Sequence, residues 1–264
     1  MKGHHSKVPG VLGVTGVAFS PDGRVVASVA ADATVRLWEV LSGKERLCLK
    51  GHDDATTAVC FAPDGRTLVS GSADGSAILW DVSLTGGKST AGPKDAKDLQ
   101  IRWELLAGDD SAEAFRAMGD LARSPREAVR LFEDRFRIVT STPPETIGRL
   151  VAQLDSDDFD ERERASAALE KLGATAPDAL RQALLGQPSP ELRRRAESIL
   201  GKLDTTEARA ARRQMLRALE VLEQLDTPEA RKLLESLGQG APESRLTQEA
   251  KAALDRLRKR EKTP

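Results

Sequence analysis

The chain has 264 residues, which is enough for one large or two ordinary domains with a substantial buried core. Its 40 Lys and Arg residues nearly balance its 41 Asp and Glu residues, and the formal charge of -1 disfavours non-specific binding to nucleic acid or to an acidic membrane surface. Aromatic residues make up 3% of the chain and Tyr is absent, so the residues that usually stack on bases are scarce.

The N-terminal residues and the cysteines favour a cytoplasmic protein. The apolar stretch 8–17 is interrupted by Pro9 and by glycines, which does not fit a signal peptide. No run approaches the roughly 18 apolar residues of a transmembrane helix, so a membrane is not among the expected partners. Cys48 and Cys60 both lie in apolar runs, and we expect reduced, buried core residues rather than a disulfide.

An internal repeat with an offset of 42 residues occupies the first third of the chain. Three landmarks recur at that offset without a gap: Phe19–Arg24 as Phe61–Arg66, Asp32 as Asp74, and Trp38 as Trp80. Each unit has the pattern of a strand, a Pro-Asp-Gly turn, a strand, an Asp-containing turn and a strand that ends in Trp. A fixed period of this length indicates a repeat architecture.

The second unit resembles the WD40-repeat family, whose propeller blades run from a Gly-His pair to a Trp-Asp pair. Here Gly51 and His52 open the unit, and Trp80 is followed by Asp81. The resemblance implies a buried hydrogen-bonded tetrad in which an Asp orients the His, and a Ser hydroxyl links the His to the Trp indole. Its members would be His52, Ser72, Asp74 and Trp80. Ser70 lies on the same face of the strand as Ser72, so the choice of hydroxyl stays open.

The first unit departs from this pattern. Ala30 stands where Ser72 stands in the second unit, and Trp38 is followed by Glu39 rather than by Asp. We therefore expect only a partial tetrad here, formed by His4, Asp32 and Trp38.

Two blades cannot close a propeller ring, which needs about four to eight. The missing partners could be further blades of a longer protein, copies of this chain, or the helical half of the chain. The first possibility is favoured because the chain begins almost at a Gly-His pair, inside a repeat. We therefore expect the isolated chain to oligomerise or to expose apolar surface.

The composition changes after the second repeat. We expect a WD40 segment over 1–83, a linker rich in Gly, Pro and Lys over 84–103, and an α-helical domain over 104–264. Apolar residues at helical spacing predict helices over 110–122, 125–136, 144–154, 159–172, 176–185, 190–203, 206–225, 227–237 and 244–259.

An Ala, then Leu, then Leu pattern recurs in the predicted helices. It occupies Ala165, Leu169 and Leu172; Ala196, Leu200 and Leu203; Ala218, Leu222 and Leu225; and Ala250, Leu254 and Leu257. A small and a large residue on one stripe let helices approach closely and stack. This resembles HEAT-type repeats, with a plain helical bundle as the alternative. The predicted fold is thus a partial all-β propeller of about two blades followed by an all-α domain, an arrangement similar to that of large bacterial WD40-repeat proteins.

Three patterns that suggest a ligand site are better explained otherwise. The segment Gly86–Ser89 lacks the earlier glycine of a phosphate-binding loop and fits a linker. The acidic segment Asp155–Asp160 lacks the Gly and Glu of a calcium loop and fits the capped start of a helix. The three histidines, His4, His5 and His52, form no convincing metal or catalytic set, so we expect no metal, no cofactor and no active site.

Basic clusters occur at Arg193–Arg195, at Arg212 and Arg213, and in the C-terminal tail. Glutamates lie among them, which favours solvated helix faces with paired charges. The function that the sequence favours is a non-enzymatic protein–protein interaction scaffold. The alternatives are a helical solenoid that binds nucleic acid, or the regulatory or targeting part of a larger enzyme.

Overall fold

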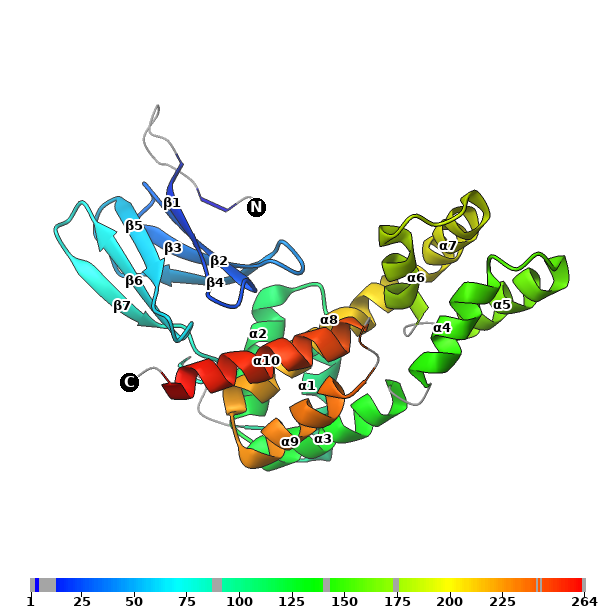
Figure 1. Cartoon of the computed structure of the whole chain (residues 1–264). Helices are drawn as coiled ribbons and strands as arrows, with labels where there is room; N and C mark the ends of the chain where they lie inside the picture. The colour runs from blue at the N-terminus through cyan, green and yellow to red at the C-terminus, as the bar shows by residue number, and fades with distance from the viewer. Residues whose placement is uncertain are drawn as a thin grey trace. The chain divides into compact units, whose positions relative to one another are not determined.

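A computed structural model describes residues 3–4, 13–86, 92–139, 143–172, 176–240, 242 and 244–262. In these residues the chain forms seven strands followed by ten helices (Figure 1). They belong to two compact units, one made of Met1–Ser124 with Lys262–Pro264 and the other of Pro125–Glu261. The predicted order, a β region followed by an α-helical region, is confirmed.

The strands form two antiparallel sheets. The first sheet has the order β1-β2-β3-β4 and contains Val14–Phe19, Val25–Ala30, Thr34–Glu39 and Glu45–Lys50. The second has the order β5-β6-β7 and contains Thr56–Phe61, Thr67–Ser72 and Ala77–Asp81. At an offset of 42, the counterpart of β4 would be 87–92, and residues 87–91 lie outside the described part of the chain.

The Pro-Asp-Gly segments form the predicted tight turns. Gly23 and Gly65 have φ angles of 70° and 67°, a left-handed conformation that glycine adopts without steric cost. Each glycine donates its backbone N–H to the carbonyl three residues earlier, at 2.9 Å to Ser20 and 3.0 Å to Ala62. The repeat seen in the sequence therefore corresponds to a repeated backbone geometry.

The two sheets pack face to face, with β5 against β1 and β2. Because side chains alternate along a strand, every second residue of each strand enters the core between the sheets. That core contains Val25, Ala27, Val29, Val35, Leu37, Leu68 and Val82, with Val59, Phe61 and Trp80 packed against it. Both cysteines are free thiols, Cys48 is half-buried, and Cys60 is exposed. The expectation of a buried Cys60 is wrong, because Cys60 lies on the other face of the second sheet.

Helices α1 (Ala96–Ala107) and α2 (Ser111–Ala122) belong to the first unit. The first eight residues of α1 fall inside the predicted linker 84–103. Helix α2 packs against α1 and against the edge strand β4. At this contact Ser111 Oγ donates to the Glu39 carboxylate at 2.9 Å, and Arg46 pairs with Glu39 at 3.2 Å. Glu39, which replaces the usual Asp after the first Trp, thus anchors α2 to the sheet.

The second unit contains eight helices in its described residues. They are α3 (Pro125–Val139), α4 (Pro144–Gln153), α5 (Phe159–Leu172), α6 (Ala176–Leu185), α7 (Pro190–Leu203), α8 (Thr206–Leu225), α9 (Pro228–Gly238) and α10 (Arg245–Lys262). All nine predicted helices are present when α2 is included. Ser189 and Thr227 cap α7 and α9, since each side chain accepts a backbone N–H from the first turn of its helix.

Helices α4 to α7 form two stacked helical pairs. Helix α4 packs on α5 and α6 on α7, while α4 also contacts α6 and α5 contacts α7. The small residues of the Ala–Leu–Leu pattern lie at the helix contacts. Ala165, Ala196, Ala218 and Ala250 are all at most 1% exposed. Close helix approach is therefore the structural reason for alanine at these positions.

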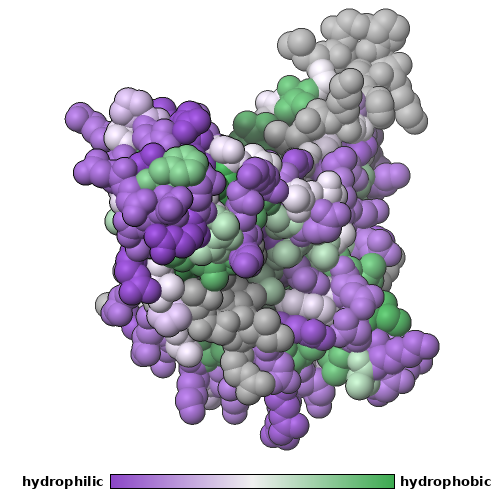
Figure 2. Space-filling view, turned by 90° about the vertical axis from the view of Figure 1, so that its right-hand side faces the viewer, coloured by the Kyte–Doolittle hydropathy of each residue, from purple (hydrophilic) through white to green (hydrophobic). Residues whose placement is uncertain are grey.

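Most charged side chains lie at the surface, whereas Glu39, Arg46, Arg217, Glu220 and Glu223 are buried. Hydrophilic residues cover most of the face shown in Figure 2, with smaller hydrophobic groups between them. In the described part of the chain, no helix combines the length and the apolar character needed to cross a membrane.

Candidate functional site

Each sheet holds one buried histidine in a polar chain of side chains. In the second sheet, His52 Nε2 lies 2.7 Å from Ser70 Oγ, and Trp80 Nε1 donates to the same oxygen at 2.8 Å. His52 Nδ1 lies 3.4 Å from Asp74 Oδ2. The chain thus runs from the acid through the imidazole and the hydroxyl to the indole.

The donors and acceptors of this hydrogen-bonded chain match one another. The Trp80 indole N–H can only donate, so Ser70 Oγ accepts it, and the single hydroxyl proton of Ser70 is free to bond His52 Nε2. With Nε2 as the acceptor, the imidazole N–H is on Nδ1 and faces the Asp74 carboxylate. Each buried polar group has a partner in this arrangement, which rigidifies the sheet.

The predicted member Ser72 is not part of this chain. Ser72 Oγ donates instead to the backbone carbonyls of Asp54 and Ala55, at 2.9 and 3.1 Å. Trp80 pairs with Leu68 in the sheet register, so Ser72 lies one full strand repeat, about 7 Å, farther from the indole than Ser70 does. Ser70, the alternative, supplies the hydroxyl between His52 and Trp80.

The first sheet contains a hydrogen-bonded chain of the same kind, which includes the expected members His4, Asp32 and Trp38 and adds Ser28. His4 Nε2 lies 2.7 Å from Ser28 Oγ, Trp38 Nε1 donates to that oxygen at 2.7 Å, and His4 Nδ1 lies 3.1 Å from Asp32. The comparison of Ala30 with Ser72 missed this serine, because the relevant pair at an offset of 42 is Ser28 and Ser70. His5 lies outside the described residues.

One further hydroxyl supports each acid. Thr34 Oγ1 donates to Asp32 at 2.6 Å and lies 3.2 Å from His4 Nδ1. Its counterpart, Ser76 Oγ, lies 3.0 Å from His52 Nδ1. The Ser76 hydroxyl, together with the backbone N–H groups of Asp53 and Ser76, holds the pKa of the Asp74 carboxyl well below its usual value. The acid therefore stays ionised beside the imidazole.

The glycine of each Gly-His pair has a steric role. A Cβ atom on Gly51 would lie 2.8 Å from Cη2 of Trp80, and one on Gly3 would lie 2.8 Å from Cη2 of Trp38. Such a distance is shorter than real carbon contacts, so any larger residue would displace the ring. The Gly-His pair thus allows the backbone to lie directly on the Trp ring.

This geometry gives the histidines a structural role. Both ring nitrogens of His4 and His52 are engaged by side chains of the same sheet, which leaves neither available as a general base or metal ligand. No group of three or more His, Cys, Asp or Glu side chains suited to a metal ion occurs in the described ranges.

The structure bears on one of the two loop motifs. Of the motif Gly86–Ser89, only Gly86 is described. Asp158 accepts the backbone N–H of Asp160 at 2.8 Å and so caps α5, which confirms that reading for the acidic segment.

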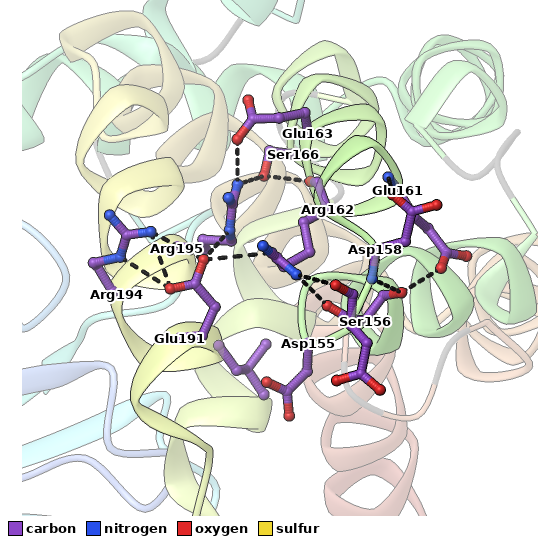
Figure 3. A network of polar contacts seen from close by, with 12 residues as sticks. Asp155, Ser156, Asp158, Glu161, Arg162, Glu163, Ser166, Glu191, Arg194 and Arg195 are labelled. Carbon is purple, nitrogen blue, oxygen red and sulfur yellow. Dashed lines mark hydrogen bonds and ion pairs between the residues drawn. The ribbon is translucent and has the colours of Figure 1, made fainter.

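A network of charged residues joins α5 to α7 in the second unit (Figure 3). Arg195 bonds Glu163 of α5 at 2.8 Å and Glu191 of its own helix at 2.6 Å, and Arg162 of α5 lies 3.6 Å from Glu191. Hydrogen bonds from Arg194 and then from Arg195 lower the pKa of Glu191 from 4.5 to about 2. The arginine run is therefore partly neutralised by carboxylates, as the sequence suggests.

Two apolar sheet faces of the first unit remain open. We call the exposed residues Val17 and Phe19 of β1, each 66% exposed, the leading face. We call the exposed residues Ala58, Cys60, Ala77 and Leu79 of the second sheet the trailing face. Leu79 is 71% exposed, whereas its counterpart Leu37 in the first sheet is 2% exposed. Large exposed apolar side chains grouped on a sheet face are typical of interaction surfaces.

Residues 1–39 and 43–81 match the family described as WD domain, G-beta repeat. These segments coincide with the two units of the internal repeat. The curated proteins contain no match to the chain.

Proposed function

We propose, from the premise that residues 1–81 are two WD40 repeats, that this chain is a non-enzymatic protein–protein interaction scaffold. WD40 repeats generally mediate contacts between proteins and are typically not catalytic. The observation that carries the proposal is the pair of exposed apolar faces on sheets whose histidines are engaged in structural hydrogen bonds.

The geometry of the two repeats supports recognition rather than chemistry. A catalytic His needs a free nitrogen within reach of a substrate, and both imidazoles are held inside their sheets. A scaffold needs rigid elements that present loops and faces, and the His–Ser–Trp chains provide that rigidity.

The second unit supports a HEAT-like interaction module. Side-chain contacts connect equivalent helices at a regular offset of 32 residues: Glu163 with Arg195 at 2.8 Å and Glu170 with Lys202 at 2.6 Å. The Ala165 and Ala196 positions, 31 residues apart, are both buried at helix contacts. Regularly stacked helix pairs of this kind build surfaces that take a peptide or a helix.

The paired arginines weigh against the nucleic-acid alternative. Arg194 and Arg195 both contact Glu191, so a phosphate would have to displace a carboxylate to reach them. A duplex that binds the full chain at about 50 mM salt, with affinity that falls steeply as salt rises, would favour the alternative.

The proposal is tested by capture from a lysate of the source cell on the immobilised full chain. Leu79→Glu places a charge on the trailing face, and Leu185→Glu places one on α6, where the wild-type side chain is 79% exposed. We expect a defined set of proteins on the wild-type chain, of which some are lost with one variant and retained with the other. A wild-type chain that retains nothing beyond an unrelated control protein would contradict the proposal.

A further inference from the structure

We infer that copies of this chain associate head to tail, the trailing face of one copy packing on the leading face of the next. The inference rests on the proposed interaction role and adds the identity of one partner, a second copy of the chain. Its basis is the contact between the two sheets within one chain, which we use as a template. Each of the two sides of that contact has counterpart residues, 42 positions away, that are exposed.

The first half of the template is the core-facing side of the first sheet. Val35 and Leu37 are buried there by the second sheet, at 0% and 2% exposed. At an offset of 42 these residues become Ala77 and Leu79, which occupy the same strand positions in the second sheet and are exposed. The trailing face is therefore the equivalent of a surface that this chain already buries under a sheet.

The second half of the template is the side of the second sheet that receives the first. Val59 and Phe61 of β5 pack against the core between the sheets. Their counterparts in the first sheet are Val17 and Phe19, which have the same side chains and are each 66% exposed. The leading face thus repeats the residues that receive a sheet in the intact contact.

The polar parts of the template are repeated as well. Trp80 and Ser70 of the receiving side correspond to Trp38 and Ser28, and each pair is joined by the same hydrogen bond. Trp38 and Ser28 are already buried within the chain, each 4% exposed, so a sheet that docks on the leading face would contact Val17 and Phe19 of β1.

A contact between two different faces is heterologous, so it can repeat from copy to copy. The trailing face is less bulky than its template, since Gly71 and Ala77 replace Val29 and Val35. The contact between copies should accordingly be weaker than the contact within a chain and depend on concentration.

The test is the mass of the full chain by light scattering over a concentration series. The apparent mass of the wild-type chain should rise with concentration, from the mass of the monomer toward a small multiple of it. Leu79→Glu on the trailing face and Phe19→Glu on the leading face should each remain monomeric, and Leu185→Glu on α6 should behave as wild type. Circular dichroism checks that the exposed substitutions leave the fold intact.

Mixing the two monomeric variants separates head-to-tail contact from other modes. Each variant retains one intact face, so the mixture should form a one-to-one dimer through the Leu79 of one copy and the Phe19 of the other. A symmetric contact through one face alone would spare one variant and would not be restored by mixing, and this outcome would overturn the inference.

Failure of the inference is distinguishable from failure of the proposed function. A wild-type chain that stays monomeric up to about 100 μM would overturn the head-to-tail inference, because it excludes a contact with a Kd at or below about that concentration. If that monomer still captures other proteins in a manner sensitive to Leu79→Glu, the scaffold proposal stands without it.

Discussion

The role of Ser70 in the second sheet gives the sharpest test of the structural site. Ser70 is 1% exposed, and its hydroxyl bonds both the imidazole of His52, itself 7% exposed, and the indole of Trp80. Ser70→Ala leaves two polar groups without a partner, each of which costs about 1–3 kcal/mol when buried. Because the Trp80 indole is only partly buried, we expect a total loss of about 2–3 kcal/mol in the unfolding free energy.

The same strand provides the matched control. Ser72 differs from Ser70 by two positions and donates to carbonyls of an exposed loop, which water can satisfy after the hydroxyl is removed. We therefore expect Ser72→Ala to cost less than about 1 kcal/mol. The two variants remove the same atom from neighbouring positions. The difference between their unfolding free energies therefore isolates the contribution of the buried His–Ser–Trp hydrogen bonds.

Urea unfolding followed by Trp fluorescence is the suitable assay. The three Trp residues, Trp38, Trp80 and Trp103, all lie in the first unit, so the signal reports its unfolding selectively. The midpoint should shift for Ser70→Ala and barely shift for Ser72→Ala at an unchanged slope. Equal losses, or a larger loss for Ser72→Ala, would refute the assignment of the hydroxyl.

The remaining predictions concern both units. Ser28→Ala should lower the stability of the first unit at least as much as Ser70→Ala in the same fluorescence assay, because Trp38 is more deeply buried than Trp80. In a thermal melt followed by circular dichroism, Leu169→Ala in the α4–α7 core should cost about 2–5 kcal/mol. Gly201→Ala, with open space around the added Cβ in α7, should gain about 0.5–1 kcal/mol. The depressed pKa of Glu191 means that its contribution is complete above pH 4.5 and is lost as the pH falls toward about 2; acid titration of Glu191→Gln should show a smaller loss over that range.

The repeat made most of the first unit predictable. A 42-residue offset with identical turn residues fixes the strand order and the turn glycines, because Pro-Asp-Gly restricts the backbone locally. The choice between Ser70 and Ser72 depends on which hydroxyl lies beside His52 and Trp80 in the folded chain. The resemblance to WD40 repeats indicated Ser72. The internal repeat favours Ser70, because its counterpart is Ser28 whereas the counterpart of Ser72 is Ala30.

The start of the helical region was harder to predict from the sequence. Helix periodicity and caps located nine helices, because both are local signals. The start of α1 at Ala96 follows a Gly-Pro and Lys-rich segment whose composition is typical of a linker. Its membership of the first unit depends on contacts of α2 with Glu39 and Arg46, which lie far away in sequence and carry no local signal.

The placement of α2 bears on why the two sheet faces stay open. An uncovered edge strand is an aggregation hazard, and α2 covers the edge of the first sheet at β4 through Ser111 and through Phe115, which lies under the Arg46 guanidinium at 5.1 Å. Helix α2 thus covers the β4 edge of the first sheet, while Phe19 and Leu79 remain exposed on the faces of the two sheets. The counterparts of Phe19 and Leu79, which are Phe61 and Leu37, pack in the core between the two sheets. Apolar residues at these two exposed positions therefore fit surfaces that are covered in the working assembly.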